Sequence, residues 1–178
     1  FIVAHLGGGV SIAAIERGKI VDGTNALYEG PLTPERAGAL PTGDLMDMIF
    51  SGKFKTKEEL YARLVGKSGF NAYLNTNSAR EVGELYAQGN PTARLVFEGM
   101  AYQTAKYIAE MAAVLKGNVD AIIITGGMAF SKDLTDLISE RVSFISRVIL
   151  HPGEDEMRAL AEGCLRVLNG AETPKTYL

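Results

Sequence analysis

Three consecutive glycines, Gly7, Gly8 and Gly9, join two apolar runs at residues 1–6 and 10–15. A short glycine link between runs rich in Ile, Val and Ala predicts a β-hairpin. Because glycine has no Cβ, the backbone N–H groups of such a turn can crowd around an anion. The turn is therefore a candidate phosphate site, although an ordinary tight turn has the same sequence pattern.

A turn-rich segment at residues 24–41 holds a second group that could do chemistry. Its glycines and prolines exclude long regular elements, and its charged cluster consists of Glu35 and Arg36. A loop of this length inside a compact domain is more often functional than idle, although many such loops are only connectors.

Two familiar nucleotide motifs do not fit the chain. A P-loop that ends at residues 66–68 would need a glycine where Tyr61 stands. The dinucleotide fingerprint would need a glycine at Ile12, and a helix rather than a strand after the turn. Any nucleotide must therefore be bound in another way.

Composition narrows the class of protein. The net charge of −3 and the lack of a Lys/Arg run argue against a nucleic-acid partner. The single cysteine, Cys164, excludes a disulfide framework within the chain and is expected to fill the core. No stretch is apolar enough for a membrane span, and no leader pattern opens the chain. The sequence therefore predicts a cytoplasmic protein without a membrane partner.

The elements that position these residues follow from hydrophobic periodicity and capping signals. Three antiparallel strands come first, then a helical stretch, then two strands that each precede a helix. Right-handed crossovers turn this order into an α/β domain with a mixed five-stranded sheet and helices on both faces, as in the ribonuclease H-like (actin-like ATPase) fold. The strand at 120–125 lacks alternation, which predicts burial on both faces. The predicted strands cover residues 1–6, 10–15, 20–22, 120–125 and 147–151, and the predicted helices cover 44–50, 56–64, 77–88, 90–117, 131–141 and 152–169.

Several motifs, taken in order, resemble the butyrate kinases of the acetate kinase group, within the sugar kinase, heat-shock chaperone and actin superfamily. They are residues 5–9 (HLGGG), 30–38 (GPLTPERAG), 101–103 (AYQ), 125–127 (TGG) and 152–157 (PGEDEM). The resemblance extends over nearly the whole chain.

The resemblance implies a kinase of two similar domains with the active cleft between them. Residues 1–170 would form the C-terminal domain and residues 171–178 a tail. The chain begins inside a strand-like run, which fits an excised piece, so the missing N-terminal domain would be a partner in the site. ATP would transfer its γ-phosphoryl group to a short-chain carboxylate such as butyrate, Mg²⁺ would assist, and the parent would be a homo-oligomer. The fragment alone would be inactive.

The resemblance also assigns the glycine turn and the loop arginine. Gly7, Gly8 and Gly9 would face the transferring or β-phosphate, with His5 at the edge of the turn. Arg36 would lie against the transferred phosphoryl group, where a guanidinium can bridge phosphate and carboxylate. The alternatives are a strand-end histidine and a surface arginine paired with Glu35.

The nucleotide would lie against Gly126 and Gly127 at the end of a strand, as in the adenosine motif of these kinases. Residues 128–130 depart from the Gly-Glu-Asn that acetate kinases usually carry there, which leaves the base and ribose contacts open. Asn77 and Arg80 occupy the place of a nucleotide-contacting stretch, although Arg80 could equally be a plain helix-surface residue.

The acidic cluster at a helix start, with Glu154 and Glu156, is the expected region for Mg²⁺, which in these kinases is held mostly through water. Favourable placement of carboxylates at the positive end of a helix dipole is the structural alternative.

The chain as a whole could also be a non-catalytic ATP-binding clamp of the actin or chaperone type. Arg36 discriminates between the two, because a clamp has no reason to hold a guanidinium toward a carboxylate substrate.

Overall fold

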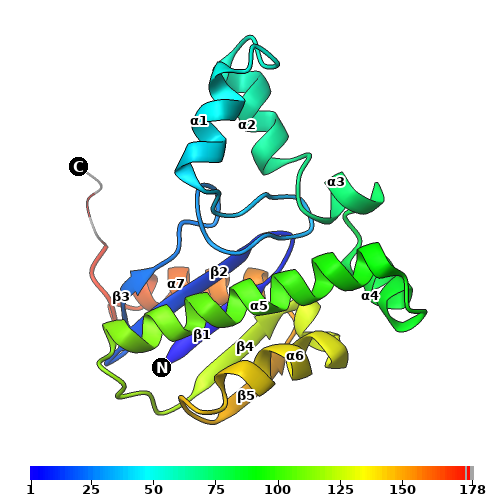
Figure 1. Cartoon of the computed structure of the whole chain (residues 1–178). Coiled ribbons are helices and arrows are strands. Elements are labelled where there is room, and N and C mark those ends of the chain that lie inside the picture. Colours follow the sequence, from blue (N-terminus) through cyan, green and yellow to red (C-terminus); the bar gives the residue numbers. More distant parts are fainter. Residues whose placement is uncertain (175, 177–178) are drawn as a thin grey trace.

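The computed structural model describes residues 1–174 and 176, and its centre is one five-stranded sheet in the order β3-β2-β1-β4-β5. The first three strands form an antiparallel meander, and the last two run parallel to β1 (Figure 1). The predicted mixed sheet is therefore confirmed. The strands are β1 (Ile2–Leu6), β2 (Val10–Glu16), β3 (Lys19–Gly23), β4 (Ile122–Gly126) and β5 (Val148–Pro152).

The register of the parallel strands brings chemistry-bearing residues to one edge of the sheet. His5 on β1 lies beside Thr125 on β4, and Thr125 lies beside His151 on β5. The carboxyl ends of all three strands therefore meet at the edge where the turn at residues 7–9 leaves β1. Ligands of α/β sheets commonly bind at this kind of edge.

The core lies on one face of the sheet, under the long helix α5 (Pro91–Val114) and helix α6 (Lys132–Val142). Asn90 caps α5 by accepting from the N–H groups of Thr92 and Ala93, as the Asn-Pro start predicts. The apolar residues of α5 recur at helical spacing, and most of that stripe is buried. The buried residues of this helix are Ala93, Val96, Phe97, Met100, Ala101, Thr104, Ala105, Ile108, Met111 and Ala112.

Two shorter helices continue this layer, α3 (Phe70–Leu74) and α4 (Ala79–Ala87). The ring of Phe97 on α5 stacks on Phe70 at 6.5 Å and on Tyr86 at 4.8 Å between centroids. Because each buried aromatic ring contributes about 1.5–3 kcal/mol, this cluster fixes α3 and α4 against α5. Helix α3 was not predicted, because five residues are too few to show a helical period.

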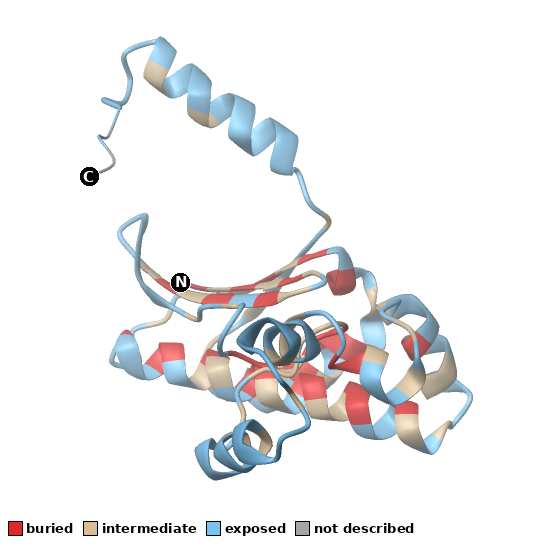
Figure 2. Ribbon diagram, turned by 90° about the horizontal axis from the view of Figure 1, so that it is seen from above, coloured by how far each residue is buried: buried red, intermediate tan, exposed pale blue. Residues whose placement is uncertain are grey.

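The opposite side of the sheet carries only helix α7 (Glu156–Leu168), which stands apart from the strands (Figure 2). No residue of α7 is buried. The prediction that β4 is buried on both faces is therefore wrong, since Ile123 and Thr125 are only half-buried. Cys164, expected in the core, is exposed for the same reason.

Helices α1 (Thr42–Phe50) and α2 (Lys57–Val65) form a hairpin that projects from the domain (Figure 1) and has no buried residue. Thr56 caps α2, as its sequence predicts.

In the predicted tail, residues 171–174 and 176 form no helix or strand, and residues 175, 177 and 178 lie outside the described part. Within the described residues, no helix is both long and apolar enough to cross a membrane.

Candidate functional site

The turn needs glycine at Gly9 because a side chain approaches it closely there, and not because its backbone is left-handed. None of Gly7, Gly8 and Gly9 has a positive φ angle. A Cβ on Gly9, however, would lie 2.3 Å from Nη1 of Arg36. The turn closes with the N–H of Gly7 donating to the carbonyl of Gly9 at 2.9 Å. The loop arginine therefore packs directly on the backbone of the turn.

The guanidinium of Arg36 is held without a carboxylate. Its Nη1 donates to the carbonyl of Ala26 at 2.8 Å, and its buried Nε has no hydrogen-bond partner among the described residues. Glu35 accepts instead from the side chain of Asn77 at 2.6 Å. The alternative of an Arg36–Glu35 ion pair is therefore not realised in this part of the chain. A half-buried guanidinium that lies beside a glycine turn and is paired with no carboxylate among the described residues is suited to binding an anion.

The second glycine pair meets the first turn because β4 ends against β1. Gly126 has a φ of 93°, and a Cβ there would lie 2.5 Å from the carbonyl oxygen of Leu6. Only glycine adopts this conformation at this distance without strain. Gly127 follows at once and lies next to the first turn on the same cavity.

Glu154 connects these parts. Its Oε1 accepts from the N–H of Gly127 at 3.4 Å and lies 3.5 Å from Nε2 of His5. Both side chains are close to half exposed, at 46% for Glu154 and 44% for His5. His5 is therefore part of a polar cluster at the edge of the turn, where it was predicted.

A cavity of about 690 Å³ opens between the glycine turn, α4, Gly127 and the start of α6. Its floor is apolar, with Phe97 and Met128 among the lining side chains, and its rim carries charged residues. This combination suits a flat heteroaromatic base joined to a charged chain. The lining residues are Gly7, Gly8, Ala79, Arg80, Gly83, Glu84, Ala87, Phe97, Gly127, Met128, Phe130, Ser131, Lys132, Asp133, Leu134 and Glu154.

Some of the predicted site residues line the cavity, and others do not. Gly7, Gly8, Gly127 and Arg80 line it, with the Arg80 side chain 90% exposed and its Nε 3.2 Å from Oε1 of Glu84. Gly9 is not a lining residue and contacts Arg36 instead. Asn77 does not line the cavity, and its side chain donates to Glu35 in the arginine loop. Gly126 does not line it either, and is the last residue of β4.

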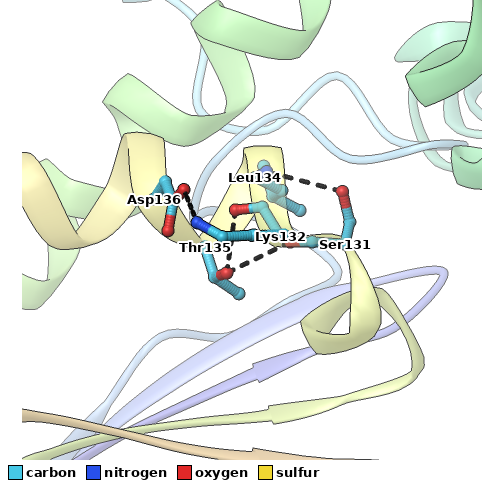
Figure 3. A network of polar contacts seen from close by, with 5 residues as sticks. All are labelled: Ser131, Lys132, Leu134, Thr135 and Asp136. Atoms are coloured by element: carbon cyan, nitrogen blue, oxygen red, sulfur yellow. Dashed lines mark hydrogen bonds and ion pairs between the residues drawn. The ribbon is translucent and has the colours of Figure 1, made fainter. Parts of the chain in front are cut away.

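The start of α6 contributes cavity residues that were missed. Figure 3 shows Ser131 capping the N–H of Leu134 at 3.4 Å while the Thr135 hydroxyl bonds the carbonyl oxygens of Ser131 and Lys132. Lys132 pairs with Asp136 one turn further on. A serine before this helix predicts the cap, but its place on the same cavity as α4 depends on packing between distant segments.

A metal would have few protein ligands here. Among the described residues, no group of three or more His, Cys, Asp or Glu side chains could hold a metal ion. Glu154 and Glu156 both line a second cavity of about 670 Å³, with His5 and His151. Mg²⁺ bound to nucleotides usually takes one or two carboxylates and completes its shell with phosphate and water. Glu154 and Glu156 fit this mode of binding, in which the protein supplies one or two carboxylates and no larger set of ligands.

Known proteins share both the sequence and the fold. The model of the Acetokinase family matches residues 1–146. A protein named probable butyrate kinase 2, from Caldanaerobacter subterraneus subsp. tengcongensis, is 54% identical over 176 residues, which cover 99% of this chain and 49% of that protein.

Among solved structures, acetate kinase from Porphyromonas gingivalis superposes with a TM-score of 0.82 at 24% identity, covering 94% of this chain and 48% of that one. Acetate kinase from Entamoeba histolytica superposes with a TM-score of 0.79 at 22% identity, covering 94% of this chain and 50% of that one. These structures show the shared fold and agree with the predicted fold class. The chain spans about half the length of the relatives it matches.

Proposed function

Because the chain belongs to the acetokinase family, we propose that it is the C-terminal, nucleotide-binding half of a short-chain fatty-acid kinase. Residues 1–170 form that domain, and the N-terminal half of the same protein closes the cleft from the other side. The full protein transfers the γ-phosphoryl group of ATP to a carboxylate such as butyrate. The products are an acyl phosphate and ADP.

The observation that carries this proposal is the place of the glycine turn between the cavity and the arginine. Gly7 and Gly8 line the cavity, while the next residue, Gly9, contacts Arg36, and neither Gly9 nor Arg36 is among the lining residues. A nucleotide in the cavity would extend its phosphates over the turn toward the guanidinium. A carboxylate that approaches from the arginine side is then placed for in-line attack.

The chemistry needs no nucleophile from the protein. A carboxylate oxygen attacks the γ-phosphorus, and the bond from that phosphorus to the bridging oxygen of ADP breaks. Arg36 would offset the negative charge that gathers on the phosphoryl oxygens and hold the carboxylate beside them. His5 would donate to the phosphates from the edge of the turn. A clamp without chemistry would leave the position of Arg36 without a purpose.

Mg²⁺ would be held by Glu154, with Glu156 as the second candidate, together with the nucleotide phosphates. Glu154 is the better placed, because it already contacts Gly127 and His5. The ion would supply neutralisation of phosphate charge. We further expect the nucleotide to contact Gly126, Gly127 and Arg80, and Asn77 to act through the arginine loop. As the resemblance implies, the full-length protein would be a cytoplasmic homo-oligomer.

The test is acyl-phosphate trapping with hydroxylamine on the full-length protein, with ATP, Mg²⁺ and a panel of acids from acetate to hexanoate. We expect hydroxamate to form with a preference among the short acids. ATP binding without any hydroxamate would favour the clamp and refute the kinase.

A further inference from the structure

Thr33 lies in the arginine loop, three residues before Arg36, and is almost fully buried at 1% exposure. Its hydroxyl donates to the carbonyl of Gly8 at 2.8 Å. The same oxygen accepts from the N–H of Arg36 at 3.1 Å and from the N–H of Glu35 at 3.3 Å. One side chain therefore bonds both the glycine turn and the loop that carries the arginine.

The hydroxyl of Thr33 uses its whole hydrogen-bonding capacity in these contacts. A hydroxyl has one donor and two acceptor sites, and all three are occupied by backbone groups. Removal of the hydroxyl would take a hydrogen-bond partner from all three backbone groups, at a residue that is itself almost fully buried. The link between turn and loop has no simple substitute.

The main chain of Thr33 is fixed as well. Its N–H donates to the carbonyl of Arg36 at 3.1 Å, and its carbonyl accepts from the N–H of Phe70 at 3.2 Å. Gly69, with a φ of 62°, lies so close that a Cβ there would be 1.7 Å from the carbonyl oxygen of Thr33. Thr33 is therefore anchored from the start of α3 and offers a rigid base for the contact with the turn.

We propose that Thr33 is a positioning residue, which sets the place of the Arg36 guanidinium relative to the glycine turn. The inference rests on the proposed function and deepens it by naming what holds the phosphate-binding turn and the arginine in register. The hydroxyl touches no reacting atom. It acts because its oxygen is hydrogen-bonded both to the carbonyl of Gly8 and to the backbone N–H of Arg36, which holds the turn and the loop together.

The first test is a double-mutant cycle in the full-length protein with butyrate as the acyl acceptor. Thr33→Val keeps the shape and removes the hydroxyl, and we expect kcat to fall about 10- to 100-fold, the cost of a misplacement of about 1 Å. Thr33→Ser should restore kcat to within about threefold, because it keeps the hydroxyl. In an Arg36→Ala background, Thr33→Val should cost less than about twofold, since no guanidinium remains to be positioned.

A matched control is Thr104→Val on α5. Thr104 is equally buried at 1%, and its hydroxyl has no partner within the described part of the chain. This variant should keep kcat and KM near the wild-type values. If Thr33→Val does not fold, Thr33→Ala at reduced temperature takes its place. An equal loss of kcat in both arginine backgrounds, or an unchanged kcat in folded Thr33→Val, would overturn the proposal.

A second readout does not depend on activity. Hydrogen exchange followed by mass spectrometry on the peptide covering residues 34–38 should be faster in Thr33→Val and unchanged in Thr33→Ser and Thr104→Val. Unchanged exchange in Thr33→Val would refute the claim that the Thr33 hydroxyl holds the arginine loop to the glycine turn. A wild-type protein that forms no acyl phosphate would refute the proposed function alone, and the exchange measurement would still decide whether Thr33 joins the two segments.

Discussion

At the scale of single residues, Arg36 and Gly9 depend on each other. The guanidinium occupies the space that a Cβ at residue 9 would need. It is held by the carbonyl of Ala26 and keeps a donor without a partner among the described residues. Such a group is already oriented before an anion arrives, and preorganised charge is most effective where charge develops during the reaction.

Replacing Arg36 should therefore affect turnover more than binding. In the full-length protein we expect Arg36→Ala to lower kcat by about 10³-fold or more. Arg36→Lys should recover only a small part of this, because an ammonium cannot bridge two oxygen pairs as a planar fork does. Steady-state kinetics with ATP and butyrate measure the effect. A raised KM with near-normal kcat would mean that Arg36 binds ground state and transition state alike.

Replacing Gly9 tests the same contact from the other side. In Gly9→Ala the new methyl group would lie 2.3 Å from Nη1 of Arg36, so the flexible end of the arginine must move. We expect kcat to fall about 10- to 100-fold while the melting temperature stays near the wild-type value. Gly43→Ala, where a Cβ meets nothing within 4 Å, is the matched control. Loss of folding in Gly9→Ala alone would mean that the turn needs glycine for its own structure.

At the scale of elements, the site depends on how strands and helices meet. β4 ends against β1, and α4 is held against α5 by the stacked rings of Tyr86 and Phe97. These two junctions form the floor and one wall of the cavity. Replacing one glycine at each junction tests its contribution.

Gly126→Ala should destabilise the domain. A Cβ there would lie 2.5 Å from a backbone oxygen of β1, and the φ of 93° is strained for alanine. We expect a loss of about 2 kcal/mol or more in the free energy of unfolding, measured by urea denaturation. Gly127→Ala is the control for stability, because its Cβ would meet only Glu154 at 3.9 Å. Equal stability of the two variants would show that the sheet edge adjusts freely.

Gly83 on α4 tests the cavity. A Cβ there would contact only the ring of Phe97 at 3.9 Å, so Gly83→Ala should be tolerated and should favour the helix by up to about 1 kcal/mol. Gly83→Leu should project into the cavity and weaken nucleotide binding at least about tenfold, because a pocket loses affinity when its volume is filled. Titration calorimetry with a non-hydrolysable ATP analogue measures this. Unchanged affinity in Gly83→Leu would place the base elsewhere.

At the scale of the whole molecule, the chain spans about half the length of the relatives it matches. The cavity beside the glycine turn opens to solvent, and the Glu154 side chain that lines it is 46% exposed. Under the proposed function, water must be kept from the phosphoryl group, which requires a second surface.

We therefore expect the isolated 178-residue chain to bind ATP but to form no acyl phosphate. The full-length protein should do both under the same conditions. Nucleotide affinity of the chain by calorimetry and hydroxamate formation by both proteins check this. Measurable acyl-phosphate synthesis by the chain alone would show that the second half is not needed for the chemistry.

The sequence by itself determined the features that depend on neighbouring residues. The meander, the caps at Thr56, Asn90 and Ser131, and the long helix after Asn90 were predicted because periodicity and capping act within a few residues. For α4 the sequence left Asn77 and Ser78 open as the cap, and the structure has Ser78. The glycine turn was likewise recognisable from its own residues. The resemblance to the acetate kinase group singled out the loop that holds Arg36. The match to that family confirms the resemblance itself, and the role of the loop stays a prediction.

Only the tertiary structure decided the contacts between distant segments. Packing between segments tens of residues apart places Thr33 on Gly8, Arg36 on Gly9 and Gly83 on the cavity, and no local pattern encodes these contacts. The errors have the same origin: the burial expected for β4 and Cys164 depended on where α7 would pack, and α7 stands away from the sheet. A side chain's type and its local period specify the element it belongs to, but its chemical environment is set by the surfaces that other elements bring to it.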